Sequence, residues 1–287
     1  MPYSTVIDRD AVEARLNDAD WLLFDCRFEL ADPEAGRRTY SEGHLPGAVH
    51  VHLDEDLAGP RGPGTGRHPL PSLGEFADKL RRWGVDGKRQ LVAYDSGPGA
   101  MAVRFWWLAR HLGLTSVAVM SGGYGAWERE GRPIQRETPP SPPGRFTPVT
   151  RKDDVMDVDT LRRRVKSGEA LLLDARDAAR YRGEHEPIDS KAGHVPGALN
   201  RPFVTNLDES GEFRAPEELR GEFDELLAGR DPVDVVHMCG SGVTACHNLL
   251  AMEHAGLPGS KLYVGSWSHW ITDPSRPVAT GEEQKSE

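Results

Sequence analysis

The chain has 287 residues, of which 38% are hydrophobic, and a formal net charge of −10 at pH 7. This length allows one large domain or two domains of ordinary size. The acidic balance gives no general attraction for nucleic acids or anionic membranes. No stretch approaches the roughly 18 to 20 consecutive apolar residues of a membrane-spanning helix. The first residues lack the basic start and apolar core of a secretory signal, so we expect a cytoplasmic protein.

The sequence contains only three cysteines, Cys26, Cys239 and Cys246. Without a signal peptide, this odd number predicts free thiols rather than a disulfide framework. No pair has C-x-x-C spacing, and Cys239 and Cys246 have only His237 and His247 near them. The sequence therefore predicts no metal site.

Apolar runs alternate with amphipathic helical patterns along the chain. In chain order, the first half predicts a strand at 21–25, a helix near 73–82, a strand at 91–94, a helix near 100–112 and a strand at 117–120. The second half predicts a helix near 157–166, a strand at 171–174, a helix near 216–228, a strand at 233–238, a helix near 243–255 and a strand at 262–264. Such alternation is typical of an α/β fold with a doubly wound, mostly parallel sheet. The stretch 104–112 is apolar on most sides, which predicts a buried helix.

The two halves also resemble each other. Four pairs of segments match in the same order: 22–29 with 172–179, 43–50 with 193–200, 91–97 with 235–241, and 121–134 with 264–278. The offset in residue number between the two members of each pair is too long for a solenoid repeat and indicates a duplicated domain. We therefore predict an N-terminal domain at 1–134, a proline-rich linker at 135–150 and a C-terminal domain at 151–287.

A predicted strand ends at Cys239, and a helix opens after the loop "CGSGVTA". Ligands of parallel sheets bind beyond the carboxyl ends of the strands, where this cysteine falls. Gly240 and Gly242 allow conformations that turn successive N–H groups inward, and Ser241 and Thr244 add hydroxyl donors. A loop of this kind at a helix N-terminus lowers the pKa of a thiol. The pattern favours a thiolate nucleophile over the alternative, a buried core cysteine.

Four features carry a family resemblance: this loop, the paired "GHLPGA" and "GHVPGA", the following "CHNLLA" and the closing "GSWSHW". Through them the chain resembles the tandem-domain rhodanese sulfurtransferases over nearly its whole length. In that family only the C-terminal domain is catalytic, and here Asp95 stands in the place of the cysteine in the N-terminal copy. The resemblance implies that Cys239 accepts a sulfur as a persulfide. The sulfur then passes to an acceptor such as cyanide, glutathione or thioredoxin, without a metal or an organic cofactor.

Within the family, "CGSGVTA" resembles the 3-mercaptopyruvate branch, because thiosulfate enzymes often carry two basic residues after the cysteine. That branch implies a serine–histidine–aspartate arrangement beside the thiolate. Its matching positions are Ser241, His68 and Asp54, which places the site between the two domains. Taken alone, the "RHPLP" stretch around His68 is typical of a surface loop. Thiosulfate remains the alternative donor.

The resemblance further implies cationic groups for a small anionic substrate. Arg180 matches the family arginine that holds a carboxylate or sulfonate. The second arginine, which usually follows "EP", is absent from "EPIDSKAGH", where Lys191 offers a substitute. The predicted substrate-binding residues are Arg180, Lys191, Gly240, Gly242, Val243 and Thr244.

Several other residues are better explained by packing. We expect core positions for Cys26 and Cys246, and packing beneath the active loop for Trp267 and Trp270. His44 and His194, in the two "GHxPGA" turns, are expected to satisfy local backbone groups.

Two rival functions fit part of the pattern. A cysteine phosphatase uses a similar loop but needs an arginine at the position of Ala245. A sulfur carrier or binding module without enzymatic activity is the other alternative, and the intact Cys239 loop argues against it.

Overall fold

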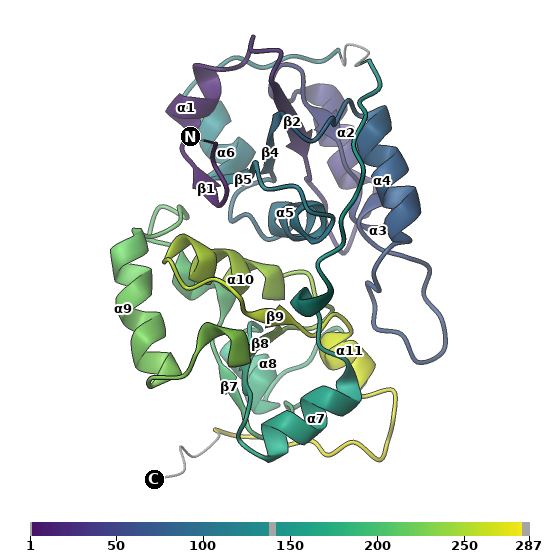
Figure 1. Ribbon diagram of the computed structural model, residues 1–287, viewed down its shortest axis with the longest axis vertical. Helices are drawn as coiled ribbons and strands as arrows, with labels where there is room; N and C mark the ends of the chain where they lie inside the picture. The colour runs from purple at the N-terminus through teal and green to yellow at the C-terminus, as the bar shows by residue number, and fades with distance from the viewer. Residues whose placement is uncertain (1, 138–141, 283–287) are drawn as a thin grey trace. The chain divides into compact units, whose positions relative to one another are not determined.

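The computed structural model describes residues 2–137 and 142–282, so residues 138–141 of the predicted linker lie outside the described residues. The chain forms two compact units (Figure 1). The first unit comprises Met1–Gly59, Leu70–Arg151 and Leu207–Phe213, and the second comprises Pro60–Pro69, Lys152–Asn206 and Arg214–Glu287. Each unit therefore includes a short segment from the other half of the sequence, and His68 belongs to the second unit. The domain boundaries at 134 and 151 stay a prediction.

The first unit contains a five-stranded sheet in which every strand pair is parallel, with the order β1-β5-β4-β2-β3. Its strands are β1 (Val6–Ile7), β2 (Trp21–Asp25), β3 (Val49–His50), β4 (Gln90–Tyr94) and β5 (Val117–Met120). Its helices are α1 (Arg9–Glu13), α2 (Ala35–Glu42), α3 (Leu53–Asp56), α4 (Leu73–Arg82), α5 (Ala102–His111) and α6 (Gly123–Arg129).

The second unit repeats this design with four parallel strands in the order β7-β6-β8-β9. Its strands are β6 (Leu171–Asp174), β7 (Ala198–Asn200), β8 (Val235–Met238) and β9 (Lys261–Leu262). Its helices are α7 (Val158–Lys166), α8 (Ala178–Arg182), α9 (Pro216–Leu227), α10 (Ala245–His254) and α11 (Ser266–Trp270), with short 3-10 turns η1 (Lys152–Asp154), η2 (Phe203–Asn206) and η3 (Pro232–Asp234). A parallel bridge between Val155 and Leu262 takes the place that β1 has beside β5. The two sheets therefore share one strand order, as duplication requires.

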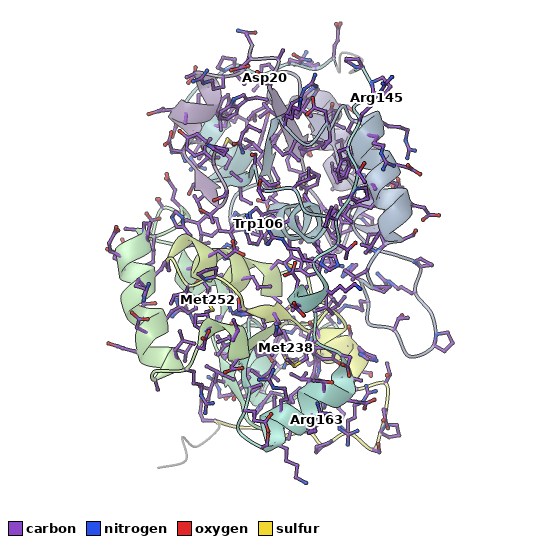
Figure 2. All side chains as sticks on the ribbon, viewed as in Figure 1. Asp20, Trp106, Arg145, Arg163, Met238 and Met252 are labelled. Atoms are coloured by element: carbon purple, nitrogen blue, oxygen red, sulfur yellow. The ribbon has the colours of Figure 1, made fainter. Side chains whose placement is uncertain are left out.

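Both faces of the second sheet are covered, which explains its continuous apolar strands. Leu172, Val236 and Met238 pack into one core with Trp267 and Trp270. On the opposite face, a second core contains Leu171, Leu173, Leu219, Phe223, Val235 and Met252. Figure 2 labels Met238 and Met252, one from each of these cores. Successive residues of a strand point to opposite faces, so one strand supplies both cores.

The predicted α/β class with doubly wound parallel sheets is confirmed. Each strand and helix expected from the hydrophobic pattern is present, with small shifts at the ends. The strand predicted at 233–238 starts at Val235, because Pro232–Asp234 forms a 3-10 turn capped by Asp231. Helix α5 is buried along most of its length, as expected, with Trp106 only 1% exposed. No helix within the described ranges is long and apolar enough to cross a membrane.

Candidate active site

Cys239 follows β8 directly and is held by the loop that leads into α10. Its side chain is only 1% exposed. The backbone amides of Ser241 and Gly242 donate to its Sγ at 3.4 and 3.1 Å. Gly242 has a φ of 78°, and a Cβ there would lie 2.2 Å from the Val264 carbonyl oxygen. The loop therefore needs glycine at this position, and it directs two N–H dipoles at the sulfur.

The segment that opens α11 supports this loop from behind. The amide of Cys239 donates to Ser266 Oγ at 3.1 Å, and the amide of Trp267 donates to the Cys239 carbonyl at 3.0 Å. Ser268 N donates to the Gly240 carbonyl at 2.9 Å. Ser266 adopts a positive φ of 53°, which is unfavourable for a residue with a side chain. Its Oγ accepts from Cys239 N and donates to the Tyr263 carbonyl at 3.0 Å, so this side chain links the start of α11 to the loop.

His68 and Ser241 meet beside the cysteine. His68 Nδ1 lies 2.8 Å from Ser241 Oγ, and the two side chains are 1% and 7% exposed. The segment that carries His68 is fixed to the start of α11, because Arg67 N donates to Ser268 Oγ at 3.0 Å. The structure thus brings His68, Ser241 and Cys239 together within the second unit. Asp54 lies in α3 of the first unit, and its role beside His68 stays a prediction.

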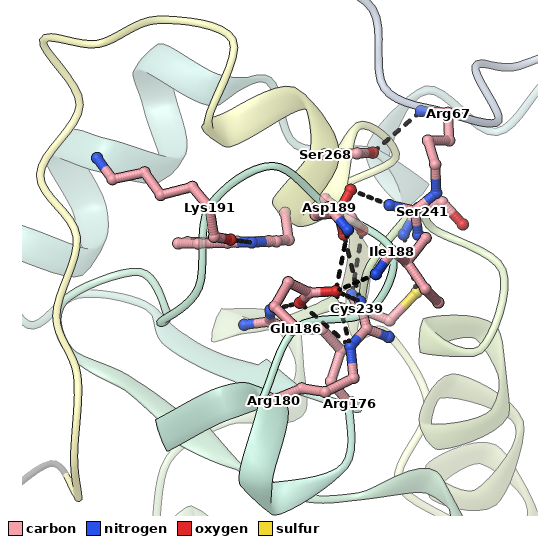
Figure 3. A network of polar contacts seen from close by, with 12 residues as sticks. Arg67, Arg176, Arg180, Glu186, Ile188, Asp189, Lys191, Cys239, Ser241 and Ser268 are labelled. Atoms are coloured by element: carbon pink, nitrogen blue, oxygen red, sulfur yellow. Dashed lines mark hydrogen bonds and ion pairs between the residues drawn. The ribbon is translucent and has the colours of Figure 1, made fainter. Parts of the chain in front are cut away.

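Arginines and carboxylates alternate around the loop (Figure 3). Arg180 donates from Nε and Nη2 to Glu186, and its Nη2 also lies 3.2 Å from Asp189 Oδ2. Arg67 pairs with the other oxygen of Asp189. A Cβ on Gly240 would lie 2.7 Å from Arg67 Nη2 and 3.5 Å from Arg180 Nη2. The guanidinium groups of Arg67 and Arg180, which both contact Asp189, therefore lie against the loop.

A buried ion pair below the loop was not foreseen from the sequence. Arg176 donates from Nε and Nη2 to both oxygens of Asp174 and from Nη2 to the Gly193 carbonyl, and it lies 4.7 Å over the Trp267 ring. Burial lowers the pKa of Arg176, but the charge and hydrogen bonds of Asp174 outweigh it and leave the pKa raised. Glu186 contributes to this raised pKa.

The same pair exists in the first unit, where Arg27 binds Asp25 and donates to the Gly43 carbonyl at 2.7 Å. The signal in the sequence was the Asp-x-Arg repeated in "FDCRF" and "LDARD". In both units the arginine ties the end of an interior strand, β2 or β6, to the "GHxPGA" turn.

Asp95 occupies the corresponding loop of the first unit as an anion. Its Oδ1 accepts from the amides of Gly97 and Gly99, both at 3.0 Å. Its Oδ2 accepts from Met101 and Ala102 at 2.8 and 3.3 Å. The loop that follows the central strand is therefore an anion-binding loop in this chain, filled here by its own carboxylate.

The remaining predicted substrate-binding residues differ in position. Val243 is buried in the loop, and Thr244 stands at the N-terminus of α10 without a side-chain capping bond. Lys191 is exposed, and Figure 3 shows its side chain extending away from Cys239. Its backbone carbonyl accepts from Trp267 Nε1 at 2.8 Å.

The residues assigned to packing lie as expected. His44 Nδ1 lies 2.8 Å from the Tyr40 carbonyl in α2, and His194 Nδ1 lies 2.8 Å from the Tyr181 carbonyl in α8. Cys26 and Cys246 are buried, and burial raises the pKa of the Cys26 thiol well above its ordinary value. Cys26 is thus a poor nucleophile, unlike a thiol that faces amide donors.

Comparison with known proteins gives consistent results. The rhodanese-like domain model matches residues 8–130 and 157–273. A probable 3-mercaptopyruvate sulfurtransferase of Pseudomonas aeruginosa is 46% identical over 98% of this chain and 100% of its own. A putative thiosulfate sulfurtransferase, SseB, of Mycobacterium tuberculosis is 37% identical over 90% of both chains. The solved 3-mercaptopyruvate sulfurtransferase of Leishmania major is 31% identical, with a TM-score of 0.81 over 92% of this chain and 73% of that one.

Proposed function

This chain belongs to the rhodanese family and is a sulfurtransferase, and from that premise we propose that it takes sulfur from 3-mercaptopyruvate onto Cys239 and passes it to cyanide or a thiol. The observation that carries the proposal is the pair of amide donors on Cys239 Sγ beside the His68–Ser241 contact. Amides directed at a sulfur favour the thiolate, and they favour an anionic persulfide for the same reason.

The first step is a sulfur transfer without change of net charge. The Cys239 thiolate attacks the thiol sulfur of 3-mercaptopyruvate, a sulfur–sulfur bond forms, and the carbon–sulfur bond breaks. Its electron pair stays on carbon, and the thiol proton ends on that carbon to give pyruvate. In this step Ser241 Oγ and His68 relay the proton between sulfur and carbon, a role that fits a hydroxyl held 2.8 Å from an imidazole nitrogen.

The second step regenerates the enzyme. A nucleophile, cyanide or a thiolate such as that of glutathione or thioredoxin, attacks the outer sulfur of the persulfide. The sulfur–sulfur bond breaks, and its electrons return to Cys239 as a thiolate. Neither step requires an external oxidant or reductant, because the oxidation of sulfur in the sulfur–sulfur bond is balanced by the reduction of the donor carbon that keeps the electron pair, and the second step passes on the same sulfur.

Two features support 3-mercaptopyruvate over thiosulfate. The loop carries Gly240 and Ser241 where a dianion would favour basic side chains. A proton relay beside the thiolate helps only a donor that has a proton to move, and thiosulfate has none. Relatives bear both names, so the donor has to be decided by assay.

Mass spectrometry tests the covalent step. Incubation with 3-mercaptopyruvate should add one sulfur atom to the peptide that contains Cys239, and cyanide should remove it. The Cys239→Ser variant should gain no sulfur and lose turnover, whereas Cys246→Ser, whose thiol lies in the core, should retain both. A Cys239→Ser enzyme with a tenth of the wild-type rate would end the assignment of the nucleophile.

A comparison of donors tests the substrate. Ser241→Ala removes one buried hydrogen bond worth about 1–3 kcal/mol, which is roughly one to two decades in kcat/KM. The loss should be larger with 3-mercaptopyruvate than with thiosulfate, since only the former needs the proton relay. Equal losses with both donors, or a wild-type enzyme at least about tenfold more efficient with thiosulfate, would transfer the assignment to thiosulfate.

A further inference from the structure

Asp189 is the carboxylate that joins two arginines from distant parts of the sequence at the catalytic loop. Its two oxygens contact different partners, Arg67 on one side and Arg180 on the other. The Asp189 side chain is 4% exposed, and those of Arg67 and Arg180 are 19% and 16% exposed. Figure 3 shows the three groups lying beside Cys239. A small anion that binds at Cys239 therefore meets guanidinium groups that already have an anionic partner.

The charges of this cluster cancel. Three cations and three anions make it up: Arg67, Arg176 and Arg180, with Asp174, Glu186 and Asp189. A thiolate on Cys239 adds a further negative charge. An incoming anion thus gains little attraction unless one of the three carboxylates gives up its partners.

Asp189 is the carboxylate best placed to do so. Asp174 is fully buried and receives three hydrogen bonds from the Arg176 side chain. Burial raises the pKa of Glu186, but Arg180 and two backbone amides outweigh that and leave the pKa lowered, so Glu186 stays ionised and held. Asp189 has a single contact to each arginine and lies on the loop between α8 and β7, next to Ile188, which is 46% exposed.

We propose that Asp189 is a resident counter-anion that gives way to the donor and restricts the site to donors with one negative charge. When the Asp189 side chain moves away from its partners, Arg67 and Arg180 each expose donors beside Gly240. The single carboxylate of a bound donor then restores the original charge balance. A donor with two charges leaves an excess negative charge next to the thiolate. Arg67 then supplies the second guanidinium that "EPIDSKAGH" lacks, from another segment of the chain.

This inference deepens the proposed function and rests on it for the identity of the donor, but a test can avoid sulfur transfer altogether. Iodoacetate and iodoacetamide both alkylate a thiolate, forming a carbon–sulfur bond as iodide leaves, and only iodoacetate carries a charge. The ratio of the two rates at Cys239, followed by peptide mass, therefore reports how well the site receives a single negative charge.

The key variant is Asp189→Asn, which keeps the shape and removes the charge. It should raise the iodoacetate to iodoacetamide ratio by about tenfold, because two guanidinium groups lose their resident anion. Arg67→Gln should lower the ratio below that of the wild type. Glu184→Gln is the matched control, since it removes an exposed carboxylate of the same segment that pairs with Arg182, and it should leave the ratio unchanged.

The donors give a second readout. Asp189→Asn should raise kcat/KM with each anionic donor by about tenfold, because neither donor then has to displace a resident carboxylate, and the preference between the two donors should stay as in the wild type. The inference is overturned if the alkylation ratio of Asp189→Asn stays within about threefold of that of Glu184→Gln, or if Arg67→Gln raises the ratio. If neither donor supports sulfur transfer, the proposed function fails, and the alkylation ratios still decide the role of Asp189. A thermal melt of each variant confirms that it is folded.

Discussion

Replacing His237 by leucine should stabilise the protein. His237 lies in β8, is 0% exposed, and neither ring nitrogen has a hydrogen-bond partner among the described residues. It alternates with Val236 and Met238, so its ring points to the face on which Val235 packs, into an apolar core. An unpaired buried polar group costs about 1–3 kcal/mol, so His237→Leu should raise the free energy of unfolding by about 2 kcal/mol and the Tm by roughly 4–8 °C.

The stability advantage of His237→Leu over the wild type should grow as the pH falls. Burial lowers the pKa of His237 to about 3, from an ordinary value of 6.5. Between these pH values the unfolded chain binds a proton that the folded chain does not, so the stability of the wild type falls as the pH drops through this window. At pH 5 the loss from this residue is about 2 kcal/mol relative to pH 8. The His237→Leu variant lacks this term, so its advantage should double from about 2 to about 4 kcal/mol over the same range.

Urea denaturation at pH 8 and pH 5 measures both quantities. His247→Leu is the control, because His247 is equally buried but lies 3.1 Å from Asn206 Nδ2, and its loss leaves that amide without one of its partners. That variant should be destabilised by about 1–2 kcal/mol. A His237→Leu protein that is less stable than the wild type, or that keeps the wild-type dependence on pH, would refute the reasoning from burial.

Three further variants test the two loops. Asp95→Ala should lower the free energy of unfolding by about 2–3 kcal/mol in a denaturant titration, since four amides lose their anion. The variant should still form the persulfide on Cys239. Loss of sulfur uptake in a folded variant would contradict this expectation. Cys239→Asp should be inactive but more stable than Cys239→Ala by thermal melting, because a carboxylate can accept from the loop as Asp95 does, and a lower Tm would contradict it. Gly242→Ala should lower kcat/KM by at least about two decades, because its Cβ meets the Val264 carbonyl; Gly168→Ala, with a similar positive φ and open space, is the control and should retain activity.

The long elements of the fold could be predicted from the sequence because their hydrophobic patterns are locally complete. Helices such as α4, α7 and α9 show an apolar stripe, and β2, β4, β6 and β8 are apolar runs between turns. Most of the elements that were not predicted are short, such as β1, β3, β7 and α8, with two to five residues each, and the longest of them is α2 with eight residues. Strands of this length have no detectable period, and they form because neighbouring strands supply hydrogen-bond partners.

The site could be predicted only as far as local motifs and family resemblance reach. Cys239 and its loop stand out because the glycines and the strand end are adjacent in the sequence. The contact between Arg67 and Asp189 spans 122 residues, and no local pattern marks it. It depends on a segment, Pro60–Pro69, that belongs to the second unit although it lies in the first half of the sequence. The tertiary structure, and not the spacing of charges, decides which arginine meets which carboxylate.

The surroundings of Asp95 and Cys239 give a physical reason to expect sulfur transfer in the second copy and not in the first. In an aspartate the charged oxygen lies one bond beyond the γ atom, and in a cysteine persulfide the outer sulfur lies one bond beyond Sγ. The carboxylate of Asp95 thus occupies in the first unit the place that an outer sulfur would take in the second. Its oxygens are bound by amides that follow Asp95 by two, four, six and seven residues. The second unit presents the first of these amides, that of Ser241, to Sγ itself, together with that of Gly242. In the first unit the Asp95 carboxylate accepts from four loop amides, so we expect that no transferable group enters this loop. In the second unit the amide of Cys246, seven residues after Cys239, already donates to the Val243 carbonyl at 3.1 Å, so we expect the amides of Ser241 and Gly242 to carry most of the stabilisation of a persulfide.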